Sequence, residues 1–178
     1  MTTLVPPALD AELRRVERLF DAALAGASAA ACGEAIRCGR ALAARRPEPD
    51  VLGLLALMLL HESRRAARTA ADGASVPLHA QDRRRWDRAL IAEAMALIDR
   101  ALGAREVGAH TLRAAIDALH AQAPDAAATD WHRIAPLYDL LAEIDASPEV
   151  ARDRAMAHAR RDRQPDLRFA GRRMEPAR

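Results

Sequence analysis

The stretch VLGLLALMLL, residues 51–60, decides the fold of this chain. An apolar run of this kind belongs in the interior of a protein, and leucine, alanine and methionine all favour helix. The run is about half as long as a membrane span requires. We therefore expect a buried helix over about residues 49–69, which breaks at Asp72 and Gly73.

The composition around this run indicates an all-α protein. Hydrophobic residues make up 51% of the 178 residues but aromatic residues only 3%, and the β-branched residues that strands prefer are scarce. All 27 basic residues are arginine, and the net charge is only +2. Because charges of both signs alternate along the chain, we predict no specific binding to nucleic acid.

The hydrophobic periodicity predicts about seven helices that stack as antiparallel, tetratricopeptide-like hairpins. Two junctions look alike, RRPEPDVLGLLALML and IDASPEVARDRAMAH, and lie about three 34-residue periods apart. The fourth segment carries two apolar stripes, which predicts an inner helix. The expected helices span residues 10–25, 28–45, 49–69, 82–102, 110–122, 130–144 and 148–161.

The expected organisation is a flexible N-terminus over residues 1–9, a single helical domain over 10–163 and a basic, mobile tail over 164–178. Cys32 and Cys38 are six residues apart, a spacing that fits neither a redox pair nor a zinc site. We expect both to be reduced. The opening residues lack the apolar core of a signal peptide. These features predict a cytoplasmic protein without membrane spans, metal or cofactor.

The polar stretch HESRRAARTAADGASVPLHAQDRRRWDR, residues 61–88, follows the apolar run directly. On a continuous helix His61, Arg65 and Arg68 share a stripe with leucines, and Arg64 lies beside it. Such a stripe could line a pocket for an anionic group. The alternative is that the arginines pair with acids, for which the candidates are Asp72, Asp82 and Asp87.

Histidine and tyrosine later in the chain offer an acid–base set. His120 flanks an apolar stripe, where most histidines are core residues that bond a carbonyl group. It could also lie close to His61, Asp130 and Tyr138 and form an acid–base site with them. The TDW motif, residues 129–131, predicts a helix start, in which Thr129 or Asp130 is the cap and Trp131 packs with Ile134 and Tyr138.

Six motifs in unbroken order resemble one known module. It is the C-terminal, tetratricopeptide-like extension of a group of extracytoplasmic-function RNA polymerase sigma factors. The similarity covers about residues 33–157 and rests on EAIRCGRAL, PEPDVLGLLALMLLHESRRAAR, QDRRRWDRALIAEAMALIDRAL, AAIDALHAQAP, TDWHRIAPLYDLL and SPEVARDRAMA.

In that family the extension follows the two regions that bind DNA and polymerase, and it controls the factor through protein contacts. This chain lacks both regions and the family's final hairpins, and Asp153 stands where the family usually has asparagine. The resemblance implies a helical fold and a role in the control of transcription.

Three hypotheses follow. The first is a sigma-factor-like binding protein that acts through a protein partner or a small anionic ligand. The second is a repurposed small enzyme that uses His61, His120, Asp130 and Tyr138 for acid–base chemistry. The third is a scaffold without a pocket. The candidate ligand-binding residues are His61, Arg64, Arg65, Arg68, Gln81, Asp82, Arg83, Trp86, His120, Trp131 and Tyr138.

These residues are expected to surround one polar cavity. Buried arginines need a counter-charge, which we expect from Asp82, from Asp130 or from a bound anion.

Overall fold

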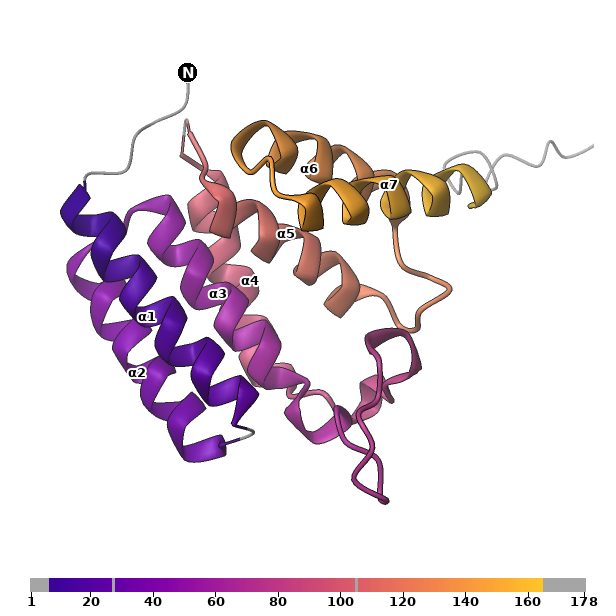
Figure 1. The fold of residues 1–178 in the computed structure, drawn as a ribbon, viewed down its shortest axis with the longest axis horizontal. Coiled ribbons are helices and arrows are strands. Elements are labelled where there is room, and N and C mark those ends of the chain that lie inside the picture. The colour runs from indigo at the N-terminus through magenta and orange to yellow at the C-terminus, as the bar shows by residue number, and fades with distance from the viewer. Residues whose placement is uncertain (1–6, 27, 105, 165–178) are drawn as a thin grey trace, which may run out of the picture. The chain divides into compact units, whose positions relative to one another are not determined.

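A computed structural model describes residues 7–26, 28–104 and 106–164 (Figure 1). Within these ranges the chain forms seven α-helices and no β-strand, which confirms the all-α prediction. The helices are α1 (Pro7–Ala25), α2 (Ala29–Arg45), α3 (Pro49–Ser63), α4 (Arg88–Leu102), α5 (Ala109–Gln122), α6 (Trp131–Ile144) and α7 (Pro148–Arg163). None of these helices is long and apolar enough to cross a membrane.

The chain divides into two compact units, Met1–Thr129 and Asp130–Arg178, and each is described by itself. The first contains α1 to α5 and the second contains α6 and α7. That both behave as the single domain expected over residues 10–163 stays a prediction. Of the two expected mobile ends, residues 1–6 and 165–178 lie outside the described residues, whereas residues 7–9 belong to α1.

Helix α3 is the centre of the first unit. It packs against α1, α2, α4 and α5, and in Figure 1 it runs between the α1–α2 hairpin and the other two helices. Its buried residues cover the whole circumference of the helix, which explains the unbroken apolar run; they are Val51, Leu52, Gly53, Leu54, Leu55, Ala56, Met58, Leu59, Leu60 and Ser63.

The fourth helix was expected to be an inner one, and α4 fits this in part, because it packs against both α3 and α5. Helix α4 buries one face only, made of Ile91, Ala94, Ile98 and Ala101. Leu102, the last residue of the helix, was expected to lie on an apolar stripe and is exposed. Leu90, Met95 and Leu97 are half-buried, so α4 lies at the side of α3 and is less enclosed than α3 itself.

A glycine allows α3 and α5 to approach closely. A Cβ atom built on Gly53 would lie 2.4 Å from the backbone nitrogen of Thr111. The Thr111 hydroxyl donates a hydrogen bond to the Pro49 carbonyl at 2.8 Å. The first turn of α5 therefore rests directly on the backbone of α3.

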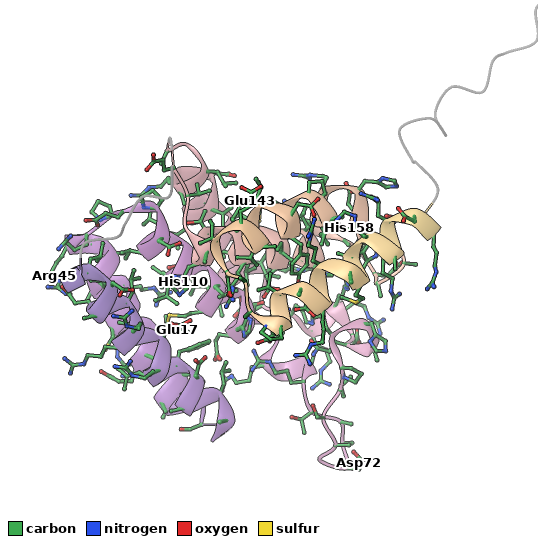
Figure 2. All side chains as sticks on the ribbon, turned by 45° about the horizontal axis from the view of Figure 1, so that its top comes forward. Glu17, Arg45, Asp72, His110, Glu143 and His158 are labelled. Carbon is green, nitrogen blue, oxygen red and sulfur yellow. The ribbon has the colours of Figure 1, made fainter. Side chains whose placement is uncertain are left out.

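Helix α3 ends at Ser63, six residues earlier than expected. The Ser63 hydroxyl donates to the Leu60 carbonyl, and the Ser63 carbonyl accepts a hydrogen bond from Asp87 N at 2.9 Å. Asp87 in turn caps α4 by accepting from Ala89 N and Leu90 N. The segment between them contains three 3-10 helices: η1 (Arg65–Ala67), η2 (Leu78–Ala80) and η3 (Arg83–Arg85). In Figure 2, Asp72 lies at the tip of this segment, away from the helices of the first unit.

The second unit is a helical hairpin. Ser147 caps α7 by accepting a hydrogen bond from Val150 N, and Pro148 occupies the first turn. Asp139 on α6 accepts hydrogen bonds from Arg154 at 2.6 Å and His158 at 2.9 Å on α7. These two contacts join the helices of the hairpin.

Candidate functional site

Asp117 on α5 is the centre of the polar cluster that follows α3. Its Oδ2 accepts a hydrogen bond from Arg64 Nη2 at 2.9 Å and lies 3.1 Å from His61 Nε2. Only 10% of the Arg64 side chain is exposed. Burial alone would raise the pKa of the Asp117 carboxyl, but Arg64 and His61 lower this pKa well below its usual range. The carboxylate is therefore ionised and neutralises the buried guanidinium.

Arg83 fixes the 3-10 helix η3 to the end of α5. The guanidinium is buried and donates to the carbonyl groups of His120 at 2.5 Å and Ala123 at 2.6 Å. Carbonyl groups in the last turn of a helix lack partners within that helix and attract a cation. The guanidinium also lies 5.0 Å from the centre of the buried Trp86 ring. Arg83 thus acts as a C-terminal cap of α5.

His120 is a half-buried member of this cluster. Burial lowers the pKa of its imidazole, and Arg64 and Arg83 lower it further, although Asp117 acts in the opposite direction. The ring is therefore neutral near pH 7. A neutral imidazole beside two cations can accept or donate a hydrogen bond but adds no charge to the cluster.

The remaining predicted residues of the first unit lie around this cluster, not in one cavity. Arg65 is 54% exposed and pairs with Glu62 at 2.8 Å. Asp82 is exposed, caps η3 and pairs with Arg84 at 3.0 Å. Arg68 donates to the His61 carbonyl. Gln81 donates to the Val76 carbonyl.

We expected His61, Arg65 and Arg68 to share a stripe on one helix. This was wrong, because α3 ends at Ser63 and the two arginines lie beyond its end. The expected counter-charge was also misplaced, since Asp117 takes the role given to Asp82. One signal could have identified it: Asp117 lies three residues before His120 and shares its helix face.

The other predicted residues belong to the second unit. Asp130 caps α6 by accepting from Arg133 N at 3.1 Å. Trp131 N donates to Gln164 Oε1 at 3.0 Å, and Arg160 lies 5.8 Å from the Trp131 ring centre. Tyr138 is half-buried on α6. Their convergence with the cluster of the first unit stays a prediction.

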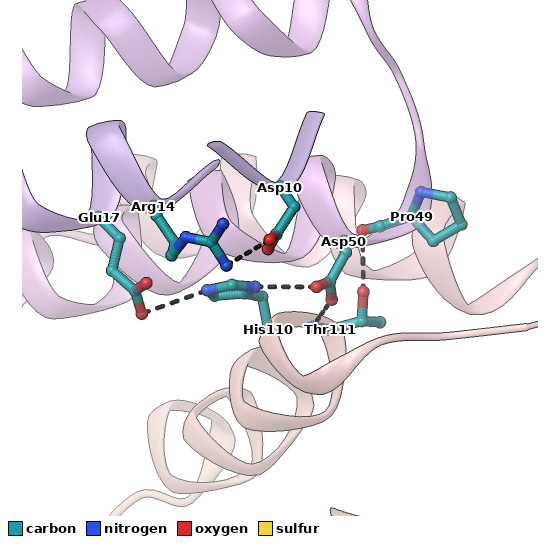
Figure 3. Close-up of polar contacts among 7 residues, drawn as sticks. All are labelled: Asp10, Arg14, Glu17, Pro49, Asp50, His110 and Thr111. Carbon is teal, nitrogen blue, oxygen red and sulfur yellow. Dashed lines mark hydrogen bonds and ion pairs between the residues drawn. The ribbon is translucent and has the colours of Figure 1, made fainter. Parts of the chain in front are cut away.

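A second polar cluster, missed at the sequence level, surrounds His110 (Figure 3). His110 Nδ1 lies 2.9 Å from Asp50 Oδ2, and Nε2 lies 3.2 Å from Glu17 Oε1. Asp50 also accepts a hydrogen bond from Thr111 N at 3.2 Å. Burial would lower the pKa of His110, but the hydrogen bonds to the two carboxylates raise it to about 9. The imidazolium therefore joins α1, α3 and α5.

No local motif marks this second cluster, because its members lie 60 and 93 residues apart in the sequence. Only the packing of three helices brings them together. Within the described ranges, no group of three or more histidine, cysteine or acidic side chains is placed to hold a metal ion.

A hollow of about 530 Å³ lies beside the end of α3. It is separate from the buried contact of Arg64 with Asp117, and its walls combine charged and apolar side chains. The lining residues are Glu62, Ser63, Arg65, Ala66, Arg85, Asp87 and Leu90.

The known proteins to which the chain is similar have no assigned function. Residues 20–102, a little under half of the chain, match a family of unknown function, DUF6596. The chain is 47% identical over 138 residues to an uncharacterized protein from Rhizobium meliloti (strain 1021). This match covers 77% of the chain and 33% of the relative, so the chain spans about a third of that protein's length. No solved structure matches.

Proposed function

We propose that this chain is a regulatory binding module that acts through a protein partner, like the sigma-factor extension that it resembles. The observation that carries the proposal is the contact of Arg64 with Asp117. Because the chain neutralises this buried cation itself, Arg64 serves, together with Arg83, to hold the loop against α5. What the first unit offers to other molecules is then its outer surface.

The geometry gives less support to the other hypotheses. A small anion at the buried cluster would have to compete with Asp117 for Arg64. His61 lies 3.1 Å from Asp117, a pairing that acid–base sites also use, but the other expected members Asp130 and Tyr138 belong to the second unit. Duplex DNA has no part in the proposal, because basic and acidic residues alternate in the sequence.

The size of the matched relative is compatible with a module. A match that covers 77% of this chain but 33% of a longer protein is expected when the shared segment is one part of a larger architecture. The partner we propose is the pair of sigma regions that precede the extension in the resembled family. A cytoplasmic location is part of this proposal.

Calorimetric titration tests it. The full chain is titrated into a protein that consists of the two sigma regions of a factor from the resembled group. We expect a one-to-one complex with a dissociation constant on the order of micromolar, as for other transient domain contacts.

The matched control is the pair of sigma regions from an extracytoplasmic-function factor that naturally lacks the extension. Equal binding to both proteins, or the absence of binding at about 100 μM, would contradict the proposed partner.

A further inference from the structure

We propose that the hollow beside the end of α3 binds a small amino acid with an aliphatic side chain. Its walls carry two acids and two arginines, together with the apolar side chains of Ala66 and Leu90. Asp87 caps α4, and one oxygen of Glu62 is paired with Arg65. The second oxygen of Glu62 and the Arg85 guanidinium are therefore the groups left for a ligand, and a zwitterion suits both. The hollow is partly open to solvent, and its volume of about 530 Å³ leaves room for a ligand of this size.

Glu62 provides the acceptor for the ammonium group. Only 10% of its side chain is exposed, and Oε1 is paired with Arg65. The other oxygen, Oε2, is buried and has no hydrogen-bond partner in the described part of the chain. A buried carboxylate oxygen without a donor is unfavourable, so a ligand that supplies an N–H group there gains affinity.

Glu62 Oε2 is buried, so a ligand reaches it only after a neighbouring side chain moves, and we assign this movement to Arg65, which pairs with Oε1 of the same carboxylate. The Arg65 side chain is 54% exposed, and ion pairs at such exposed positions stabilise a protein little. Rotation of Arg65 toward solvent therefore opens the carboxylate at small cost. The same guanidinium can then contact the ligand from outside.

Arg85 provides the donor for the carboxylate group. It lies on η3 between residues with assigned contacts: Arg83 binds the end of α5, and Arg84 pairs with Asp82. The pKa of the Asp82 carboxyl is lowered chiefly by the hydrogen bond from Arg84 and further by the nearby charge of Arg85, but among the described residues no hydrogen bond or direct ion pair holds the Arg85 side chain. A free guanidinium binds a carboxylate through two parallel hydrogen bonds.

The apolar part of the ligand has a defined place. Leu90 is half-buried in the first turn of α4, and Ala66 lies on η1. Both line the hollow together with the charged groups. An aliphatic side chain bound here would cover this apolar surface. The inference goes beyond the proposed protein partner and does not depend on it.

Calorimetric titration of the full chain with three probes tests the inference. L-leucine carries both charged groups, L-leucine methyl ester lacks the carboxylate, and N-acetyl-L-leucine lacks the ammonium group. We expect L-leucine to bind and each derivative to bind at least about tenfold more weakly, because each loses one charged contact. No measurable binding of L-leucine at 10 mM would overturn the proposal, whatever the sigma regions do.

Variants locate the site. Arg85→Ala should weaken L-leucine binding at least about tenfold, whereas the matched control Arg84→Ala, on the same turn but outside the hollow, should change it less than about twofold. Glu62→Gln should also weaken binding, with folding checked by circular dichroism. Equal losses for Arg84→Ala and Arg85→Ala would overturn the site. If Glu62→Gln lowers stability, the comparison of L-leucine binding by Arg85→Ala and Arg84→Ala still decides the outcome.

Discussion

His110 is the residue whose chemistry has the widest structural consequence. Its ring lies between Asp50 and Glu17 and is only 16% exposed. In Figure 2, His110 and Glu17 both lie among the helices of the first unit. Because both ring nitrogens face carboxylates, the protonated form is the one that the fold stabilises.

The free energy of unfolding should therefore depend on pH through His110. Its pKa is raised from 6.5 to about 9, so the stabilisation is complete below pH 6.5 and is lost as pH rises through about 9. The shift corresponds to roughly 3 kcal/mol. Urea unfolding at pH 6 and pH 10 should show this loss in the native chain and not in His110→Gln. Parallel behaviour of both proteins would contradict the role of the imidazolium.

At the scale of elements, two contacts determine how α3 meets its neighbours. The Ser63 carbonyl and Asp87 N join the end of α3 to the start of α4. Gly53 lets the first turn of α5 lie against α3. The second contact involves backbone atoms, which cannot rotate away as a side chain can. It therefore sets the distance between the two helices.

Gly53→Ala should lower the free energy of unfolding by about 1–3 kcal/mol or more, the cost of overpacking a core. The added Cβ would lie 2.4 Å from Thr111 N, so α5 must shift. Gly33→Ala in α2 is the matched control. There the nearest atom is Arg37 Nη1 at 3.7 Å, and the change should stabilise the helix by about 0.5–1 kcal/mol. Equal effects in thermal unfolding of the two variants would contradict the close approach.

For the whole molecule, the sequence was sufficient to predict the helices but not their contacts. The apolar run of residues 51–60 predicted a buried helix, and α3 buries nearly all of it. The residues after it were harder to predict. The Ser63 carbonyl at the end of α3 bonds to Asp87 N, and Asp87 caps α4, whereas the sequence pattern suits a helix that continues beyond Ser63. Periodicity describes one helix at a time and does not contain such contacts.

The candidate site was predicted in part for the same reason. Arg64, Arg83 and His120 do share a polar cluster, yet the acid at its centre, Asp117, comes from a helix whose register against α3 is a property of packing. The His110 cluster depends on packing entirely. Hydrogen bonds across 60 or more residues leave no local pattern.

The central claim is that the buried cluster of Asp117, Arg64 and His61 stabilises the fold and is not itself a binding site. A double-mutant cycle of Arg64→Met and Asp117→Leu, measured by urea unfolding of the full chain, tests it most directly. Each single change should cost about 3–5 kcal/mol, because it leaves one buried charge without its partner. The double variant should recover at least about 2 kcal/mol of the summed loss. An Arg64→Met protein within about 0.5 kcal/mol of the native chain, with no coupling to Asp117, would contradict the claim.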